Sequence, residues 1–140
     1  MIRKGTYVLF LTIPGADADV GALGRIHLPP GRYCYVGSAM GGLDQRIGRH
    51  LAPQKKIRWH IDRLTVICTD AEAYESYPDP ISECGLADLA EKCGAVPFAD
   101  GFGCSDCGCR THLFLLGEGS EERIITSAGL KKHTRSQPPH

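Results

Sequence analysis

The order of apolar and polar residues predicts several strands in the first part of the chain. The apolar run from Thr6 to Ile13 is typical of a buried strand, and a proline–glycine pair and an acidic loop follow it. A short strand is predicted near Leu23 to Leu28, and a Pro-Pro-Gly turn at residues 29–31 leads into another strand from Arg32. We expect these three strands to form an antiparallel sheet.

The stretch from Arg32 to Leu51 predicts a strand followed directly by a helix. Aromatic and small apolar residues fill the first positions, and Gly37 and Ser38 are expected to end the strand. Apolar residues then recur at every fourth position, as on the buried face of a helix: Leu43, Ile47 and Leu51. Arg46 and His50 are also four residues apart, so a cation and an imidazole project side by side near the end of the strand.

The second half of the chain predicts further strands and two helices. The predicted strands are Leu64 to Thr69, Glu72 to Tyr77 and His112 to Leu116, and the predicted helices are Ile81 to Cys93 and Glu121 to Lys132, the latter with Ser120 as its N-cap. The expected fold is therefore α+β. It has a small, mainly antiparallel central sheet of three or more strands flanked by helices, with an additional C-terminal strand and helix. We expect one domain over residues 1–130 and a polar tail over residues 131–140.

Composition indicates an ordinary globular protein, with 42% hydrophobic and 23% charged residues. No apolar run approaches the roughly 18 residues of a membrane-spanning helix, so no membrane contact is expected. The N-terminal apolar run is followed by Pro14-Gly15 and not by a small-residue cleavage site, so we expect it to be a strand and not a signal peptide. We expect a cytoplasmic protein whose seven cysteines are free thiols, because disulfides are rare in a reducing compartment.

Charge is distributed unevenly along a chain whose formal net charge is zero. Residues 1–65 carry ten Lys and Arg against four Asp and Glu, whereas the remainder carries six against twelve. A positive face on a neutral protein can bind phosphates locally, with a steep dependence on salt. For any single cation the simpler interpretation is a solvated surface position.

Several short motifs occur in an order that is similar to one known superfamily. Tyr35-Val36-Gly37-Ser38-Ala39 followed by Arg46-x-x-Arg49-His50 resembles the second half of the GIY-YIG nuclease signature, and Gly5-Thr6-Tyr7 resembles its first half. The gap between the two halves is longer than usual, so an extra strand or loop is expected there. WHID at 59–62, ECGLADL at 83–89 and GFGCSDCGC at 101–109 resemble an uncharacterised branch of that superfamily, a domain of unknown function sometimes fused to endonuclease III-type repair enzymes.

The resemblance implies a metal-dependent endonuclease that hydrolyses phosphodiester bonds in nucleic acid, with DNA as the expected substrate and repair or processing as the context. The implied catalytic residues are Tyr7, Tyr35, Arg46, His50 and Glu83. A water deprotonated by tyrosinate, or through a tyrosine–histidine relay, would attack phosphorus. Tyr7 is the preferred base, His50 would lower its proton affinity, and Tyr35 could exchange roles with Tyr7. Arg46 would neutralise charge on the phosphate oxygens.

Other residues are candidates for binding the substrate. Gly37 would let a phosphate approach the backbone. The remaining candidates are Ser38, Arg49, Lys55, Lys56 and His60. Trp59 could stack on a base or fill the core.

Glu83 is the candidate ligand for Mg²⁺ or Mn²⁺. It shares a helical face with Leu86, Ala87 and Ala90, and an inward-facing carboxylate needs a partner. The partner could be a magnesium ion, which commonly takes one or two protein carboxylates and several waters. The alternative is an ion pair, for example with Arg46. The resemblance favours the metal.

Three cysteines and a histidine could supply a tetrahedral zinc site: Cys104, Cys107, Cys109 and His112. Structural zinc sites normally draw two pairs of ligands from separated segments, whereas these residues lie close together. The branch that the chain resembles carries serine at the position of Cys104. The alternative is that the thiols pack beneath a helix and that His112 opens the last strand, and this alternative is favoured.

Two other classes of function stay open. The chain could be a non-catalytic nucleic-acid-binding module on the same scaffold, or a zinc- or redox-responsive protein that uses Cys104, Cys107 and Cys109. A minimal GIY-YIG core lacks a domain that reads DNA, so a repair-protein partner or a homodimer is expected to contribute specificity.

Overall fold

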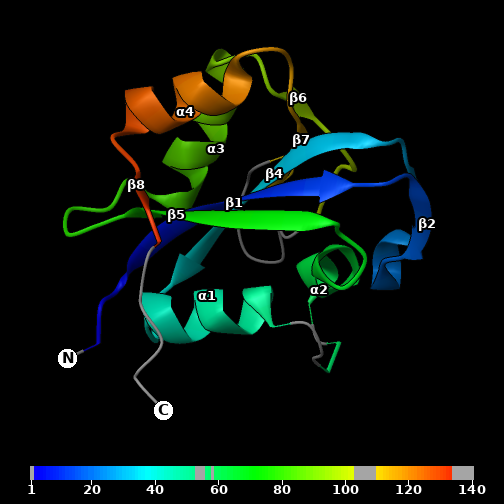
Figure 1. The fold of residues 1–140 in the computed structure, drawn as a ribbon, viewed down its shortest axis with the longest axis horizontal. Coiled ribbons are helices and arrows are strands. Elements are labelled where there is room, and N and C mark those ends of the chain that lie inside the picture. Colours follow the sequence, from blue (N-terminus) through cyan, green and yellow to red (C-terminus); the bar gives the residue numbers. More distant parts are fainter. Residues whose placement is uncertain (1, 53–55, 58, 103–109, 134–140) are drawn as a thin grey trace.

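The computed structural model describes residues 2–52, 56–57, 59–102 and 110–133. Within these residues the chain forms an α+β fold with a six-stranded antiparallel central sheet flanked by four α-helices (Figure 1). The elements in order are β1 (Gly5–Ile13), β2 (Ala16–Asp19), a 3₁₀ turn (Gly21–Leu23), β3 (Arg25–Leu28), β4 (Gly31–Ala39), α1 (Leu43–Leu51), α2 (His60–Thr65), β5 (Asp70–Ser76), α3 (Glu83–Lys92), β6 (Val96–Pro97), β7 (Leu113–Leu115), α4 (Ser120–Ala128) and β8 (Lys131–Lys132). The predicted fold class is confirmed.

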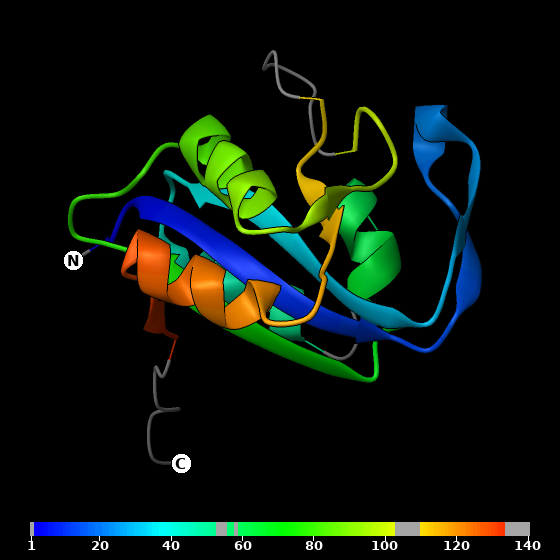
Figure 2. The same ribbon diagram turned by 90° about the horizontal axis from the view of Figure 1, so that it is seen from above.

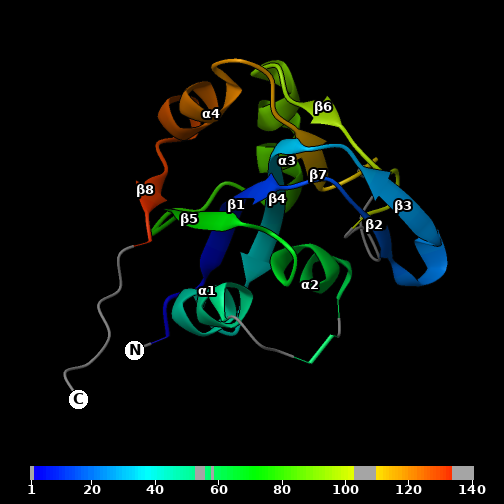
Figure 3. The same ribbon diagram turned by 45° about the vertical axis from the view of Figure 1, so that its right-hand side comes forward.

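The central sheet has the strand order β6-β7-β4-β1-β5-β8, so the long strands β4 and β1 lie at its centre. Helices α1 and α2 cover one face, and α3 and α4 cover the other (Figure 3). Because both faces of β1 are covered, its apolar residues run without interruption from Tyr7 to Leu11 instead of alternating with polar ones. Tyr7, Leu9 and Leu11 point into the core under α1 and α2, whereas Val8 and Phe10 point into the core under α3 and α4.

The strand predicted near Leu23 to Leu28 is real but does not belong to the central sheet. It is β3, which begins at Arg25 and pairs with β2 in a separate two-stranded sheet, with Ala16 opposite Leu28. The expectation of one three-stranded sheet is therefore wrong. The β2–β3 hairpin projects beyond the end of the central sheet (Figure 2) and supplies the extra segment expected between the two halves of the signature.

The segment from Leu64 to Thr69 is not a strand, because most of it belongs to the end of α2 and the turn that follows. Ile61, Leu64 and Thr65 are buried, and they recur at the three- and four-residue spacing of a helix. The β-branched residues of this segment favour a strand by propensity alone, and packing against the core overrides that preference.

Two other boundaries differ from the prediction. Strand β4 continues through Gly37 and Ser38 to Ala39, because its pairing with β1 extends that far. Helix α4 has Gly119 at its N-cap, so the prediction of Ser120 as the cap is wrong, and it ends at Ala128 because Gly129 adopts a left-handed conformation with φ 62°. Strand β8 then pairs with β5.

The state of the cysteines differs in part from the expectation. Cys34, Cys68 and Cys93 are free, but Cys84 at the start of α3 is disulfide-bonded. The expectation that all the thiols are free is therefore wrong for Cys84.

In the described part of the chain, no helix has the length and apolar character needed to cross a membrane.

Candidate active site

The candidate active site lies where the edge of β4 loses its strand partner. Strand β7 pairs with β4 from Tyr33 to Tyr35, and the Val36 N–H donates to the His112 carbonyl at 3.0 Å. Beyond this point, no described strand pairs with that edge of β4. The Ser38 carbonyl there accepts a hydrogen bond from Arg46 Nη1 at 3.0 Å. An arginine from α1 therefore occupies a position that a strand would otherwise fill.

Tyr7 and His50 form a buried pair beside this edge. The phenolic oxygen of Tyr7 lies 2.7 Å from Nε2 of His50, and the two residues are only 1% and 2% exposed. Burial raises the pKa of Tyr7 well above its usual value, and the charge and hydrogen bonding of Arg46 only partly oppose this effect. The charges of Glu83 and Asp62 raise the pKa of Tyr7 further.

Gly37 lies directly opposite Tyr7 in the β1–β4 pairing. A β-carbon on Gly37 would collide with the phenolic oxygen and the adjoining ring carbon of Tyr7. The sequence suggested that glycine is needed here to let a phosphate approach the backbone. The structure gives a different reason, because the phenol of Tyr7 fills the space that a side chain would need.

Arg46 contributes a cation that no described carboxylate neutralises. Its guanidinium carbon lies 4.6 Å from the centre of the Trp59 ring, and its other contacts are with the Ser38 carbonyl and the Tyr7 phenol. These groups are all neutral. Among the described residues no ion pair to Arg46 is found, so its charge is available to an external anion.

Arg49, one turn further along α1, is held differently. Its guanidinium makes a two-point ion pair with Asp62, with N···O distances of 2.6 and 2.9 Å, and also donates to the Lys56 carbonyl at 2.7 Å. Asp62 is fully buried. The structure therefore places this candidate substrate-binding residue in an internal ion pair.

Glu83 begins α3, which starts at this edge of the sheet because Ser82 caps it by accepting from the Gly85 N–H at 3.0 Å. The Glu83 side chain is 32% exposed, and Nδ1 of the His112 ring lies 4.0 Å from its carboxylate. No described lysine or arginine pairs with Glu83, so the alternative of an ion pair with Arg46 is not found.

The surroundings of Glu83 fit a divalent metal ion. A partly exposed carboxylate that no described lysine or arginine neutralises is an oxygen ligand of the kind that magnesium takes. Leu86, Ala87 and Ala90 are buried as predicted, whereas Glu83 lies at the boundary of the core.

The remaining candidates are placed as follows. Tyr35 is buried, with its ring centre 6.4 Å from His50 and 6.0 Å from Phe102. His60 also contacts Phe102, at 5.4 Å between ring centres, and the side chain of Lys56 is exposed. Lys55, Cys104, Cys107 and Cys109 lie outside the described residues.

Two neighbours of the site are not among the predicted catalytic or substrate-binding residues. Asp62 is the last residue of the WHID motif and a charged residue among buried ones on α2. His112 is predicted as a zinc ligand or as the first residue of a strand, and the structure places it beside Glu83.

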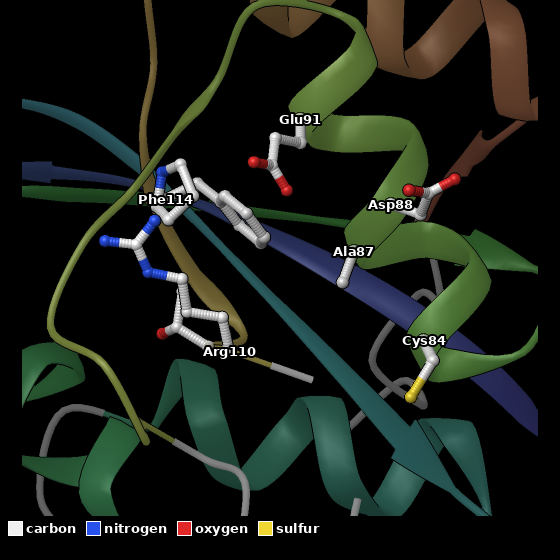
Figure 4. Close-up of a pocket in the computed structure, with 8 residues that line it drawn as sticks. Cys84, Ala87, Asp88, Glu91, Arg110 and Phe114 are labelled. Carbon is white, nitrogen blue, oxygen red and sulfur yellow. The ribbon is translucent and has the colours of Figure 1, made fainter. Parts of the chain in front are cut away.

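A separate hollow of about 160 Å³ lies between α3 and strands β6 and β7 (Figure 4). Asp88 and Glu91 line it from α3, and its one arginine, Arg110, pairs with Asp100 at 2.6 Å. Two carboxylates in its wall would repel a phosphate backbone. We therefore place the candidate site at the edge of β4 and not in this hollow.

Comparison with known proteins identifies a family without assigning an activity. No curated protein and no solved structure matches the chain. Residues 6–134 match the family described as domain of unknown function DUF123. Because the match covers nearly the whole chain, this protein belongs to the DUF123 family.

Proposed function

We propose that the protein is a metal-dependent endonuclease of the GIY-YIG type, which hydrolyses phosphodiester bonds in nucleic acid and acts on DNA. The observation that carries the proposal is the meeting of three groups at the open edge of β4. These groups are the Tyr7–His50 pair, the Arg46 cation, which has no counter-ion among the described residues, and the partly exposed carboxylate of Glu83.

These groups suit attack on a phosphodiester. Arg46 presents N–H donors and a positive charge to the phosphate oxygens, on which charge increases in the transition state. No strand of the described residues covers this side of the site, so an extended backbone would approach Arg46 and Glu83 from there. Glu83 would hold the divalent ion, which when bound supplies positive charge beside the leaving 3′ oxygen.

The raised pKa of Tyr7 favours a relay over a free tyrosinate. A buried phenol stays protonated at neutral pH and can take a proton from water only if it passes its own proton on. His50 Nε2, at 2.7 Å, is the acceptor in position to receive that proton. Tyr7 would then bridge the attacking water and His50. The Tyr35 ring also contacts the His50 ring and would help to hold it in position.

The order of the sequence motifs supports the proposal independently of the geometry. Tyr7, Tyr35, Arg46 and Glu83 each match a position of the GIY-YIG pattern, and all lie within the residues matched by the DUF123 family. The DUF123 family is described only as a domain of unknown function, so the family match does not by itself assign a nuclease activity.

The test is cleavage of labelled DNA and RNA (single-stranded, duplex, flap, branched and abasic) with Mg²⁺, with Mn²⁺ and with chelator. We expect cleavage only with metal, with products that carry 5′-phosphate and 3′-hydroxyl ends, since the 3′ oxygen is the leaving group. Glu83→Ala is compared with Glu91→Ala, an exposed carboxylate on the same helix. Loss in both variants, or cleavage that persists in chelator, would contradict the proposal.

A second candidate is a nucleic-acid-binding module without catalysis. It is favoured by the deep burial of Tyr7 and His50, which leaves Arg46 and Glu83 as the accessible groups. Binding to the same substrates, lost in Arg46→Ala, without cleavage under any metal condition would select this candidate.

A further inference from the structure

Trp59 contacts two arginines of α1, Arg46 and Arg49, which differ in their ion pairing. The guanidinium carbon of Arg46 is 4.6 Å from the centre of the indole ring, and that of Arg49 is 4.3 Å. Both distances are those of cation–π contacts. Arg49 is neutralised by Asp62, whereas Arg46 has no described carboxylate partner. The same tryptophan therefore contacts both Arg46, which is available to a phosphate, and Arg49, which is held in an internal ion pair.

Asp62 fixes the position of Trp59. Its Oδ2 accepts the backbone N–H of Trp59 at 2.9 Å, and both carboxylate oxygens accept from Arg49. Arg49 also donates to the carbonyl of Lys56, which lies three residues before Trp59. A fully buried carboxylate thus ties the start of α2, the preceding segment and helix α1 together. We call Arg49, Trp59 and Asp62 the Asp62 cluster.

Arg46 is held in place by contacts that leave its charge intact. The Ser38 carbonyl fixes one N–H group and the Trp59 ring covers the guanidinium. A carboxylate in the same place would hold the arginine more strongly, but would neutralise it and compete with a phosphate. An indole restricts the side chain without either effect.

We propose that the Asp62 cluster positions Arg46 for phosphate, with Asp62 and Trp59 as positioning residues that do not themselves touch the substrate. This inference rests on the proposed function and extends it to residues outside the catalytic set. It also assigns Arg49 to the positioning of Arg46 instead of to direct contact with nucleic acid.

The first test does not need catalysis. In full-length protein labelled with ¹⁵N-arginine, the Nε–H signals of Arg46 and Arg49 are assigned with Arg46→Lys and Arg49→Lys. We expect the indole ring to displace the Arg46 signal from that of an exposed arginine, and inorganic phosphate to move it further. In Trp59→Leu and in Asp62→Asn the Arg46 signal should shift toward the exposed position. Asp17→Asn, which alters an exposed ion pair on the β2–β3 hairpin, should change neither signal.

An Arg46 signal that is unchanged in Asp62→Asn, while the Arg49 signal moves, would overturn the inference. It would show that Asp62 fixes Arg49 alone. Trp59→Leu removes no buried charge, and the shift that inorganic phosphate induces in its Arg46 signal, expected to be smaller than in wild type, keeps the test decisive if Asp62→Asn fails to fold.

The second test is kinetic and separates positioning from general destabilisation. Per folded molecule, kcat should fall by about 10- to 100-fold in Trp59→Leu and Asp62→Asn, the scale expected for a displaced catalytic group, with KM unchanged. Trp59→Phe keeps an aromatic face and should restore most of kcat. Equal loss in Trp59→Phe and Trp59→Leu, or unchanged kcat in both, would refute the role of the ring. If the wild type does not cleave, the proposed function fails, and the arginine signals still decide whether the cluster positions Arg46.

Discussion

Tyr7 and Gly37 face each other across the central strand pair, and the phenol of Tyr7 occupies the space that any side chain at position 37 would need. The phenol also reaches Nε2 of His50 at 2.7 Å, so its position is fixed from two sides. A glycine in one strand thereby sets the geometry of a buried tyrosine–histidine pair in the site.

Gly37→Ala should therefore displace Tyr7 without changing any polar group of the site. We expect destabilisation by about 1–3 kcal/mol, the usual cost of overpacking a filled core, and loss of the Tyr7–His50 hydrogen bond. Denaturant unfolding measures the first effect, and the His50 ring signals in an NMR spectrum report the second. Gly48→Ala on α1 is the control, because a β-carbon there meets open space. Equal stability of Gly37→Ala and wild type would show that Tyr7 is free to move aside.

Tyr7→Phe separates the proton relay from packing. The ring is kept, so the core should stay intact while kcat falls by about 100-fold or more, as expected for loss of a group that transfers a proton. Single-turnover cleavage measures this change, with Tyr33→Phe as the control because that phenol donates to the Pro29 carbonyl on the far part of the sheet. Undiminished cleavage by Tyr7→Phe would exclude Tyr7 from proton transfer.

The burial of Tyr7 should also make the stability of the fold depend on pH in the alkaline range. The pKa of Tyr7 is raised in the folded protein, so its contribution is complete below the usual tyrosine pKa near 10 and is lost as the pH rises through the higher folded value. The free energy of unfolding should fall less steeply above pH 10 in Tyr7→Phe than in wild type. Identical alkaline limbs in urea titrations would contradict the assignment.

The ion pairs of Glu75 should make the stability of the fold depend on pH in the acid range. It is buried on β5 between Arg3 and His133, with N···O distances of 2.8 and 2.6 Å. Burial favours the neutral form, but Arg3 and His133 outweigh it and hold the pKa of Glu75 below its usual value of 4.5. A carboxylate with a lowered pKa stabilises the fold above its unfolded value and ceases to do so as the pH falls through the folded one.

Melting temperatures from pH 7 downward should therefore decline more gently below about pH 4.5 in Glu75→Gln than in wild type. Glu122→Gln on α4, an exposed carboxylate for which no ion pair with a described residue is found, is the control and should follow the wild type. Parallel curves for Glu75→Gln and wild type would show that the pairing contributes nothing.

His112 is buried, and its Nδ1 lies 4.0 Å from the carboxylate of Glu83, so in the proposed site it would help to orient that carboxylate for the metal. Residues that orient a metal ligand typically change affinity by about 10- to 100-fold when they are replaced. We expect His112→Gln to weaken Mn²⁺ binding on this scale in calorimetric titrations, and Glu83→Gln to abolish it. His27→Gln on the exposed hairpin should have no effect. Unchanged affinity in His112→Gln would restrict the site to Glu83.

The long periodic segments could be predicted from the sequence, and so could the fold class. The strand at Thr6 and the helices at Leu43 and Glu83 have patterns that one packing arrangement satisfies, and tertiary contacts agree with them. The strand predicted at Leu64 failed because its β-branched residues carry a local preference that burial on a helix overrides.

The site was only partly predictable, for a physical reason. Motif order indicates that Tyr7, Arg46 and Glu83 belong together, but not how they are held. The Tyr7–Gly37 contact depends on strand register across an inserted hairpin, and the Arg49–Asp62 pair depends on how two helices pack. Neither relation leaves a periodic signal in the chain.

The central claim is that Arg46 and Glu83 act together on a phosphodiester, and single-turnover cleavage of the best substrate from the panel tests it most directly. With enzyme in excess and Mn²⁺ present, Arg46→Ala and Glu83→Ala should each lower the rate by about 100- to 1,000-fold, the scale of losing one group that stabilises transition-state charge. Arg25→Ala and Glu91→Ala, both exposed and outside the site, should cleave at the wild-type rate. Cleavage by Arg46→Ala and Glu83→Ala at the wild-type rate would contradict the account, because the activity would then reside elsewhere in the protein.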